Sequence, residues 1–492
     1  MLDVTKQNKD YDTAAMGDLR VFLERAEAAG EFKRVKGADP NLEIGALFEL
    51  SHEHLYPPVM LFENMKGCDP SHRILCNVRV ARFVVGDLDL NAVKAYRSRP
   101  KEKSQPIPPR LVNTGPVYEN VIEGDAVNVN KLPTPKWHGG DGGNYVGTEC
   151  VVIVKDPDSD WVNLGTYRVS VADEKTLSVF IEEGKHGDVI RRKWWAKGKP
   201  CPIAISVGQA PILGVVASAA SKENEPEYST AGGRIGRPID VVPARVSGLP
   251  IPANAEIVYD GFMPPPSEDS RPEGPFGEWP GYYASDSRPE PVLRVQAIYH
   301  RHDPIITGNP PAKPTYPGRQ TNFVAIAALW DALEAAGVPE VKGVWKMFGG
   351  GSRFINVVAI NQQFAGHAKM AGLVAAGCLP GAYMNRITVV VDDDIDITST
   401  AEVMWALATR WDPKTQSDII DGAWTGHIDP VLSPQKRESG DITNSRIIMY
   451  AVRPYAWKDA FPIPNMIEPE YADQVRAKWS ELRFVKNLPV MR

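Results

Sequence analysis

The chain has 492 residues, and its 55 Lys plus Arg against 61 Asp plus Glu give a formal net charge of −6 at pH 7. This mildly acidic balance argues against a protein that binds nucleic acid by displacing phosphate counterions. Apolar residues at 43% and charged residues at 24% are typical of a globular chain and exclude a disordered one. One hydrophobic core stops growing near roughly 250–300 residues, so we expect two or three domains.

The N-terminus and the cysteines indicate the compartment. Residues 1–12 have neither a basic head nor an apolar run, which argues against a signal peptide. The most apolar stretch, Ile203–Ala220, is interrupted by Gln209 and Pro211, so it lacks the roughly 20 apolar residues of a membrane helix. The five cysteines are scattered without a CxxC motif, which argues against disulfides and cysteine-bound zinc. We therefore expect a soluble cytoplasmic protein with no membrane or nucleic-acid partner.

The first predicted elements form a small α/β unit. Apolar residues recur at helical spacing over Leu19–Ala26, before Gly30, and strand-like runs follow at Val59–Phe62 and Ile74–Val78. The proline-rich segment Ser104–Arg110 then reads as a stiff linker.

Short β-rich runs follow from about residue 115 to 305, separated by Gly, Pro and Asp clusters as in a barrel or sandwich. The runs are Cys150–Val154, Thr176–Ile181, Ile203–Val207, Ile212–Val216 and Val292–His300.

Strand–helix alternation returns after the loop Gly308–Gly318 and predicts a second α/β unit. Its elements are the helices Phe323–Ala336 and His367–Ala376, the strand Ile387–Val391, a helix opened by the capping box Ser399/Glu402, and the amphipathic run Tyr471–Leu482. We thus expect a mixed α/β (α+β) fold. The expected parts are an N-terminal α/β domain (1–112), a central β domain (113–320), a C-terminal α/β domain (321–455) and a tail (456–492).

The segment Pro272–Tyr283 (PEGPFGEWPGYY) carries the most informative pair of carboxylates. Glu273 and Glu278 are five residues apart, so neither helical nor strand periodicity places them on one face. We expect a Gly/Pro loop to hold them and Trp279 and Tyr282 to anchor it. Two carboxylates beside aromatic bulk can keep one of them protonated for general acid work. A solvated acidic turn is the alternative.

Three other segments leave alternatives open. Trp137–Tyr145 (WHGGDGGNY) has four glycines, which allow close backbone approach to a ligand or another strand, or form a tight hairpin. Met347–Ser352 has three consecutive glycines, which either cradle a phosphate or form a flexible turn. The acidic run Asp392–Asp394 fits a divalent-metal site, loop solvation or N-capping. No GxGxxG, GxxxxGK[ST] or HExxH motif supports a Rossmann, P-loop or zincin protein.

Five segments in register carry a family resemblance. They are WHGGDGGNY, NLGTYR at Asn163–Arg168, EGPFGEWPGYY, GHAK at Gly366–Lys369, and VVVDDDID followed by WALATRWDP. Over about residues 40–480 they resemble the UbiD family of reversible non-oxidative decarboxylases. The resemblance implies prenylated FMN bound with Mn²⁺ and K⁺ in a central split-β-barrel domain. It also implies a C-terminal α/β domain through which relatives pair.

The resemblance further implies ligands, residue by residue. The Mn²⁺ ligands are expected to be Asn163, His186 and Glu227, with Glu225 as the weaker candidate for the glutamate, and this set suits a hard or borderline ion. Leu164 stands where the family has a tryptophan, which puts the details of the K⁺ site in doubt. The implied cofactor-binding residues are Asn163, Thr166, Tyr167, Arg168, Lys185, His186, Ser218, Glu227 and Lys369, the last at the flavin phosphate.

The chemistry explains why such a cofactor is needed. Loss of CO₂ from an sp² carbon leaves a localised carbanion that no side chain delocalises, so a cofactor has to act as electron sink. The resemblance assigns Glu278 as proton donor, with Glu273 and Arg168 as its ionic partners. Arg168 favours the ionised form of Glu278 and Glu273 favours the protonated form, so their balance sets the pKa of Glu278 near neutral pH.

The substrate is the least defined part. By loose alignment, Thr321–Phe323 (with Asn322), the alanines at 375 and 376, and His427 face it, which favours a (hetero)aromatic acid over a cinnamic-type one. The expected partners are that acid, CO₂, a flavin prenyltransferase and a second copy of the chain in a homodimer or larger oligomer. A metal-assisted hydrolase using both glutamates and a flavin-free ligand-binding or scaffold protein on the same fold remain alternatives.

Overall fold

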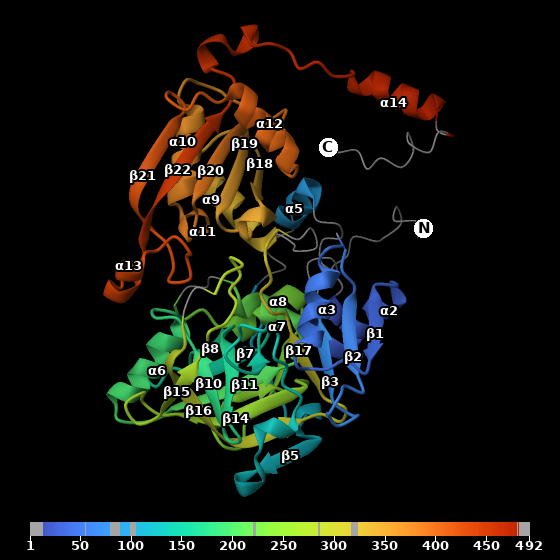
Figure 1. Ribbon diagram of the computed structural model, residues 1–492, viewed down its shortest axis with the longest axis vertical. Coiled ribbons are helices and arrows are strands. Elements are labelled where there is room, and N and C mark those ends of the chain that lie inside the picture. Colours follow the sequence, from blue (N-terminus) through green and yellow to red (C-terminus); the bar gives the residue numbers. More distant parts are fainter. Residues whose placement is uncertain are drawn as a thin grey trace. The chain divides into compact units, whose positions relative to one another are not determined.

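The computed structural model describes residues 13–54, 56–78, 89–98, 105–219, 223–283, 286–315, 323–479 and 481. The chain divides into two compact units, which are described separately (Figure 1). The first unit comprises residues up to 88 together with 98–319, and the second comprises 89–97 together with 320–492.

The described helices are divided between the two units. In the first unit they are α1 (Thr13–Gly17), α2 (Leu19–Ala28), α3 (Glu43–Ser51), α6 (His186–Ala196), α7 (Pro211–Ala217) and α8 (Glu227–Ile235). In the second they are α5 (Leu90–Arg97), α9 (Phe323–Ala335), α10 (His367–Gly377), α11 (Leu379–Ala382), α12 (Thr400–Arg410), α13 (Pro434–Ser439) and α14 (Pro469–Lys478).

The described strands of the first unit form three sheets. A four-stranded sheet has the order β1 (Phe32–Lys36), β2 (Val59–Glu63), β3 (Arg73–Cys76), β17 (Ile305–Gly308). The large central sheet runs β6 (Tyr145–Gly147), β9 (Arg168–Asp173), β10 (Thr176–Phe180), β16 (Arg288–His300), β14 (Ile257–Met263), β11 (Cys201–Val207), β7 (Val151–Lys155), β8 (Val162–Gly165), and β5 (Asn120–Glu123) and β15 (Ser270–Glu273) pair with β16. A small sheet joins β13 (Pro250–Pro252), β12 (Asp240–Pro243) and β4 (Arg110–Leu111).

One hydrophobic core runs through the four-stranded and the central sheets. Phe48 and Phe62 from the N-terminal elements belong to the same buried cluster as Ile205 and Tyr259 of the central sheet. Burial of apolar surface is the main favourable term in folding, so a shared core joins the expected N-terminal and central domains into one unit.

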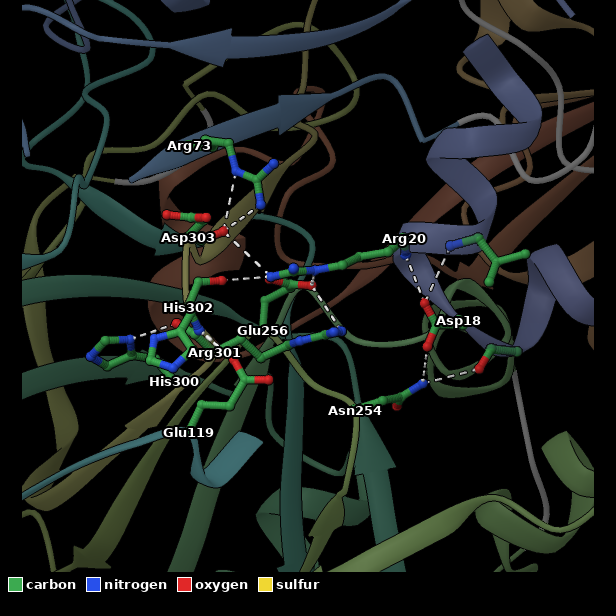
Figure 2. Close-up of polar contacts among 12 residues, drawn as sticks. Asp18, Arg20, Arg73, Glu119, Asn254, Glu256, His300, Arg301, His302 and Asp303 are labelled. Atoms are coloured by element: carbon green, nitrogen blue, oxygen red, sulfur yellow. Dashed lines mark hydrogen bonds and ion pairs between the residues drawn. The ribbon is translucent and has the colours of Figure 1, made fainter. Parts of the chain in front are cut away.

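A buried ion-pair network also fastens the N-terminal helices to the central sheet (Figure 2). Nε and Nη2 of Arg20 in α2 donate to the two oxygens of Glu256, just before β14, at 2.8 and 2.9 Å. Arg301, just after β16, donates to the same carboxylate at 3.3 Å. Asp18 caps α2 through the Arg20 N–H and also accepts from Asn254. Because the Glu256 side chain is fully buried, removing it would leave these cations unpaired.

The five-stranded sheet of the second unit contains a parallel centre. Its order is β18 (Val341–Lys346), β19 (Ile355–Ile360), β20 (Ile387–Asp392), β22 (Thr443–Ala451), β21 (Ser417–Trp424). β19, β20 and β22 are parallel, and α9 and α10 contact the sheet (Figure 1). The predicted α/β alternation of this half is therefore confirmed.

One predicted strand is wrong. The run Ile212–Val216 lies in the helix α7, which begins at Pro211. A five-residue apolar run does not distinguish a strand from a buried helical turn. Proline is favoured at the first helical position because its fixed φ suits the helix and its missing N–H is not needed there.

Two further expectations bear on the chain as a whole. The predicted domain boundaries at 112, 320 and 455 stay predictions, and residues 89–97 group with the second unit. Among the described residues, no helix combines the length and the hydropathy that spanning a lipid bilayer requires.

Candidate active site

Arg168 brings together the two carboxylates that the sequence singles out. From the start of β9, its Nε and Nη2 donate to Oε1 and Oε2 of Glu273 at 2.8 and 2.7 Å, and its Nη1 donates to Glu278. The side chains of Arg168, Glu273 and Glu278 are 9%, 0% and 12% exposed, so the cluster is nearly dry. Glu273 ends β15 and Glu278 follows in the loop of residues 274–283, which we call the acid loop. A guanidinium from another strand therefore bridges the five-residue spacing.

Aromatic side chains enclose this cluster. The guanidinium carbon of Arg168 lies 4.2 Å from the ring centre of Phe180 and 5.4 Å from that of Phe276. Phe276 packs on Tyr145 with ring centres 4.3 Å apart, and the Tyr145 hydroxyl donates to Oε1 of Glu273 at 3.1 Å. Tyr145 is the last residue of the WHGGDGGNY motif, but no role for it was predicted from the sequence.

The two carboxylates have different surroundings, which separates their chemistry. Glu273 accepts hydrogen bonds from both sides of the Arg168 fork and from Tyr145. Glu278 is bonded to Arg168 through Nη1 alone. Burial raises the pKa of Glu278, the Arg168 charge partly offsets this, and the negative charge of Glu273 adds to the rise. Glu278 is therefore the carboxyl of the pair that can hold and release a proton.

The segment of residues 137–145, which we call the glycine segment, packs directly on the acid loop. The N–H of Gly142 donates to the carbonyl of Pro275 at 2.8 Å, and a Cβ on Gly142 would lie 2.0 Å from the carbonyl oxygen of Gly274. Asp141 accepts from the Tyr283 hydroxyl at 3.2 Å and from the Gly277 N–H at 3.4 Å. Close approach to another segment is thus the alternative that holds for Gly142.

One of the two predicted aromatic anchors of the acid loop is wrong. Tyr282, expected as an anchor with Trp279, is 61% exposed. Phe276 is buried at 3% exposure instead, and its position inside the loop was not singled out. Phe276 packs on Tyr145, a contact that spacing in the sequence does not reveal. Trp279 is half-buried, and its role as an anchor stays a prediction.

Two of the three predicted Mn²⁺ ligands are in contact. Asn163 of β8 donates through Nδ2 to Oε1 of Glu227 at 2.9 Å, and the Leu164 N–H lies 3.4 Å from Oε2 of Glu227. Asn163 and Glu227 are 3% and 2% exposed, and α8 begins at Glu227. Within the described chain, Oδ1 of Asn163 is buried and accepts no hydrogen bond. A buried amide oxygen without a donor is what an absent cation would satisfy.

His186, the third predicted ligand, begins α6. Its ring meets the edge of Trp161 with ring centres 5.0 Å apart, and Trp161 donates through Nε1 to the carbonyl of Glu225. Burial lowers the pKa of His186, which favours the neutral imidazole that binds metals. The Glu225 carboxylate lies near Thr230, with the Thr230 hydroxyl 3.4 Å from its Oε1.

The other predicted cofactor residues differ in burial, and one of them, Lys369, lies in the second unit. The Tyr167 hydroxyl accepts from the Gly187 N–H at 3.3 Å, which ties the turn after β8 to the start of α6. Thr166, Lys185 and Ser218 are exposed. Lys369, in the first turn of α10, forms an ion pair with Asp418 at 2.9 Å and lines a cavity of about 540 Å³ within the second unit.

Of the predicted substrate residues, the structure describes Phe323 and His427. Asn322 lies outside the described residues. Phe323 is buried against Tyr96 in an edge-to-face contact, and His427 is half-buried in the second unit. Ala375 and Ala376 are 0% and 1% exposed in α10, so they belong to the packed core of that unit and leave no open room for a ring.

The acidic run after β20 is occupied by arginines. Asp392 accepts from Nη1 of Arg410 at 2.9 Å and from the Arg453 N–H at 2.8 Å, and Asp394 accepts from both Nη atoms of Arg410. Ion pairs with arginines therefore account for Asp392 and Asp394, whereas Asp393 is exposed, as the solvation alternative expects. In the described part of the chain no group of three or more His, Cys, Asp or Glu is arranged to hold a metal. The glycines of Met347–Ser352 form a 3₁₀ turn.

The nearly dry cluster of Arg168, Glu273 and Glu278 is built from the strands β9 and β15 of the first unit and the loop that follows β15. Three domain models described as 3-octaprenyl-4-hydroxybenzoate carboxy-lyase match the chain: the N-terminal domain over residues 23–82, the Rift-related domain over 110–314 and the C-terminal domain over 321–451. The chain belongs to the UbiD family of carboxy-lyases.

Individual relatives agree with this assignment. Pyrrole-2-carboxylic acid decarboxylase of Pseudomonas aeruginosa is 31% identical over 422 residues, covering 80% of this chain and 83% of the relative. The UbiD-class enzyme HmfF of Pelotomaculum thermopropionicum, solved with FMN, matches with a TM-score of 0.79 and 28% identity over 94% of this chain and 99% of its own. Vanillic acid decarboxylase of Sedimentibacter hydroxybenzoicus, in an open form, gives 0.78 and 26% over 94% and 99%. The predicted mixed α/β fold and family are therefore confirmed.

Proposed function

We propose that this protein catalyses the reversible non-oxidative decarboxylation of an aromatic or heteroaromatic carboxylic acid with prenylated FMN as cofactor. The observation that carries the proposal is the buried cluster in which Arg168 holds both Glu273 and Glu278. In this cluster Glu273 accepts hydrogen bonds from three donors, and burial raises the pKa of Glu278. That difference suits an acid that delivers one proton per turnover.

The residues of the first unit suit the proposed cofactor and its metal. Asn163, His186 and Glu227 would hold Mn²⁺, and the donorless Oδ1 of Asn163 supports this assignment. The ligand set of amide oxygen, imidazole nitrogen and carboxylate oxygen fits such an ion. When bound, the prenylated flavin would supply the electron sink that loss of CO₂ from an sp² carbon requires. We propose K⁺ beside it, with Leu164 in place of the family tryptophan.

The chain's own residues would orient the acid and move the proton. Arg168, flanked by Phe180, keeps Glu278 directed into the dry cluster. Glu278 delivers a proton to the carbon that has lost CO₂ and takes it back in the reverse direction. Glu273 keeps a negative charge beside Glu278, which favours the protonated form of the donor.

The proposed substrate class follows the relatives. Two of them are named for pyrrole-2-carboxylic acid and vanillic acid, a heteroaromatic and an aromatic acid. We therefore favour such acids over cinnamic-type ones. Asn322, Phe323 and His427 stay the proposed substrate residues, and Lys369 the proposed phosphate ligand.

We also propose the setting of the reaction. A flavin prenyltransferase would supply the cofactor, and the chain would act as a homodimer or a multiple of one. Exposed apolar residues of the predicted tail (456–492) support self-association, among them Ile463 at 91% and Met466 at 72% exposure. The five unpaired cysteines suit a reducing cytoplasm.

Co-expression with a flavin prenyltransferase tests the proposal. The purified protein should absorb in the near-UV and visible range and release CO₂ from at least one member of a panel of aromatic and heteroaromatic acids. Glu278→Gln should still bind the flavin but release CO₂ at least about 100-fold more slowly. A colourless protein would favour the scaffold alternative, and turnover without flavin would favour the hydrolase.

A further inference from the structure

The hydroxyl of Tyr145 lies behind Glu273, on the side that the Arg168 fork leaves open. Arg168 engages both oxygens of Glu273, and Tyr145 adds a second donor to Oε1 at 3.1 Å. We infer that Tyr145 is a positioning residue of the proton-transfer cluster, acting on Glu278 through Glu273 and Arg168. This inference rests on the proposed function and adds a residue to it.

Tyr145 is built into the structure on three sides. Its strand β6 pairs with β9, the strand that begins with Arg168, in the register Tyr145↔Ser170. Its ring packs on Phe276 of the acid loop, and its hydroxyl reaches Glu273 at the end of β15. One side chain therefore links the strand of the arginine, the strand of the fixed carboxylate and the loop of the proton donor.

The Tyr145 hydroxyl acts as a hydrogen-bond donor to Glu273. Tyr145 is 1% exposed, so its hydroxyl cannot turn to water and its proton is directed at the carboxylate. Burial, together with the charge of Glu273, raises the pKa of Tyr145, so the hydroxyl stays a donor over the working pH range. Hydrogen bonds to a charged group are about twice as strong as neutral ones, which makes this contact effective in fixing Glu273.

Loss of this donor has a specific consequence. With the hydroxyl removed, Oε1 of Glu273 keeps Nε of Arg168 as its side-chain donor. The carboxylate then lacks the donor that does not belong to Arg168, so the carboxylate and the guanidinium, joined by the fork, can shift together. Since the same guanidinium contacts Glu278, the proton donor shifts relative to the substrate carbon.

The test compares two tyrosines that make the same kind of bond. Tyr145→Phe removes the hydroxyl on Glu273, and Tyr299→Phe removes a buried hydroxyl that donates to the buried carboxylate of Asp260 at 2.7 Å. Both variants are made in the flavin-loaded enzyme. For Tyr145→Phe, kcat should fall about 10- to 100-fold, the range of a lost bond to a charged group. Its KM and flavin content should match the wild type. Tyr299→Phe should keep wild-type kcat and KM.

The outcomes separate this inference from the proposed function. A wild type that decarboxylates no panel acid contradicts the proposed function. Normal kcat in Tyr145→Phe, or an equal loss in Tyr299→Phe, contradicts the positioning role. Crystal structures of both variants provide a readout independent of turnover. Glu273 and Arg168 should be displaced in Tyr145→Phe, and native positions there would overturn the inference whatever the activity.

Discussion

The close contact between Gly142 and the acid loop predicts that alanine at this position lowers activity. A Cβ added at Gly142 would lie 2.0 Å from the carbonyl oxygen and 2.5 Å from the carbonyl carbon of Gly274. Ordinary van der Waals contact is 3.4–4 Å, so Gly142→Ala has to push the two backbones more than an ångström apart. The 2.8 Å hydrogen bond from Gly142 to Pro275 then breaks.

The expected size of the effect follows from this displacement. Overpacking costs about 1–3 kcal/mol, and the lost hydrogen bond adds about 1 kcal/mol. A misplacement of about 1 Å at reacting groups costs about 100-fold in rate. The loop that moves carries Glu278, so Gly142→Ala should lower kcat by about two orders of magnitude with the fold retained.

Two glycines of the same segment supply controls. Gly139 and Gly143 have no atom within 4 Å of an added Cβ, so alanine fits at both. Steady-state decarboxylation and thermal unfolding of the three alanine variants should separate Gly142 from the other two. Wild-type kcat in Gly142→Ala, or an equal loss in all three, would refute the reasoning.

Three further predictions address stability and the metal site. Glu256→Gln should destabilise the first unit by about 1.5–3 kcal/mol in denaturant unfolding, because the fully buried carboxylate is the ion-pair partner of the partly buried Arg20 and Arg301. Asp240→Asn, in the exposed pair with Arg110, should cost under about 1 kcal/mol. Burial raises the pKa of Glu149 from 4.5 in the unfolded chain to about 8 in the folded protein. The free energy of unfolding should therefore be highest below pH 4.5 and should fall as the pH rises through 8, by up to about 1.4 kcal/mol per pH unit. Glu149→Gln should flatten that part of the stability profile, and an unchanged profile would count against it. His186→Ala should lose both manganese and flavin while staying folded, with His302→Ala keeping both; full occupancy in His186→Ala contradicts the metal assignment.

Elements with strong periodicity could be predicted from the sequence. The helix over Leu19–Ala26 is α2, and the strand Ile387–Val391 is β20. Short apolar runs could not be predicted in this way. Ile212–Val216 fits a strand and a helical turn equally, and only the neighbouring residues distinguish the two. The sequence also did not reveal that the N-terminal and central parts share one core.

The site could be predicted wherever chemistry follows from residue type. Glu273, Glu278 and Arg168 do form one cluster, although the spacing of the glutamates alone gives no common face. Tyr145 was missed because its partner Glu273 is 128 residues away and a buried tyrosine resembles any core residue in sequence. The acidic run Asp392–Asp394 looked like a metal site because its arginine partners come from other elements.

Proton exchange in D₂O tests the central claim, that Glu278 is the proton donor, most directly. Protonation is reversible, so the flavin-loaded wild type should exchange deuterium into the C–H of added product at the position that the carboxylate left. Glu278→Gln keeps the size of the side chain but not the transferable proton. Its turnover should fall by at least about 100-fold with the flavin still bound.

We expect this exchange to be lost in Glu278→Gln and retained, at a reduced rate, in Glu273→Gln. Near-normal exchange in Glu278→Gln together with none in Glu273→Gln would show that the two carboxylates have the opposite roles.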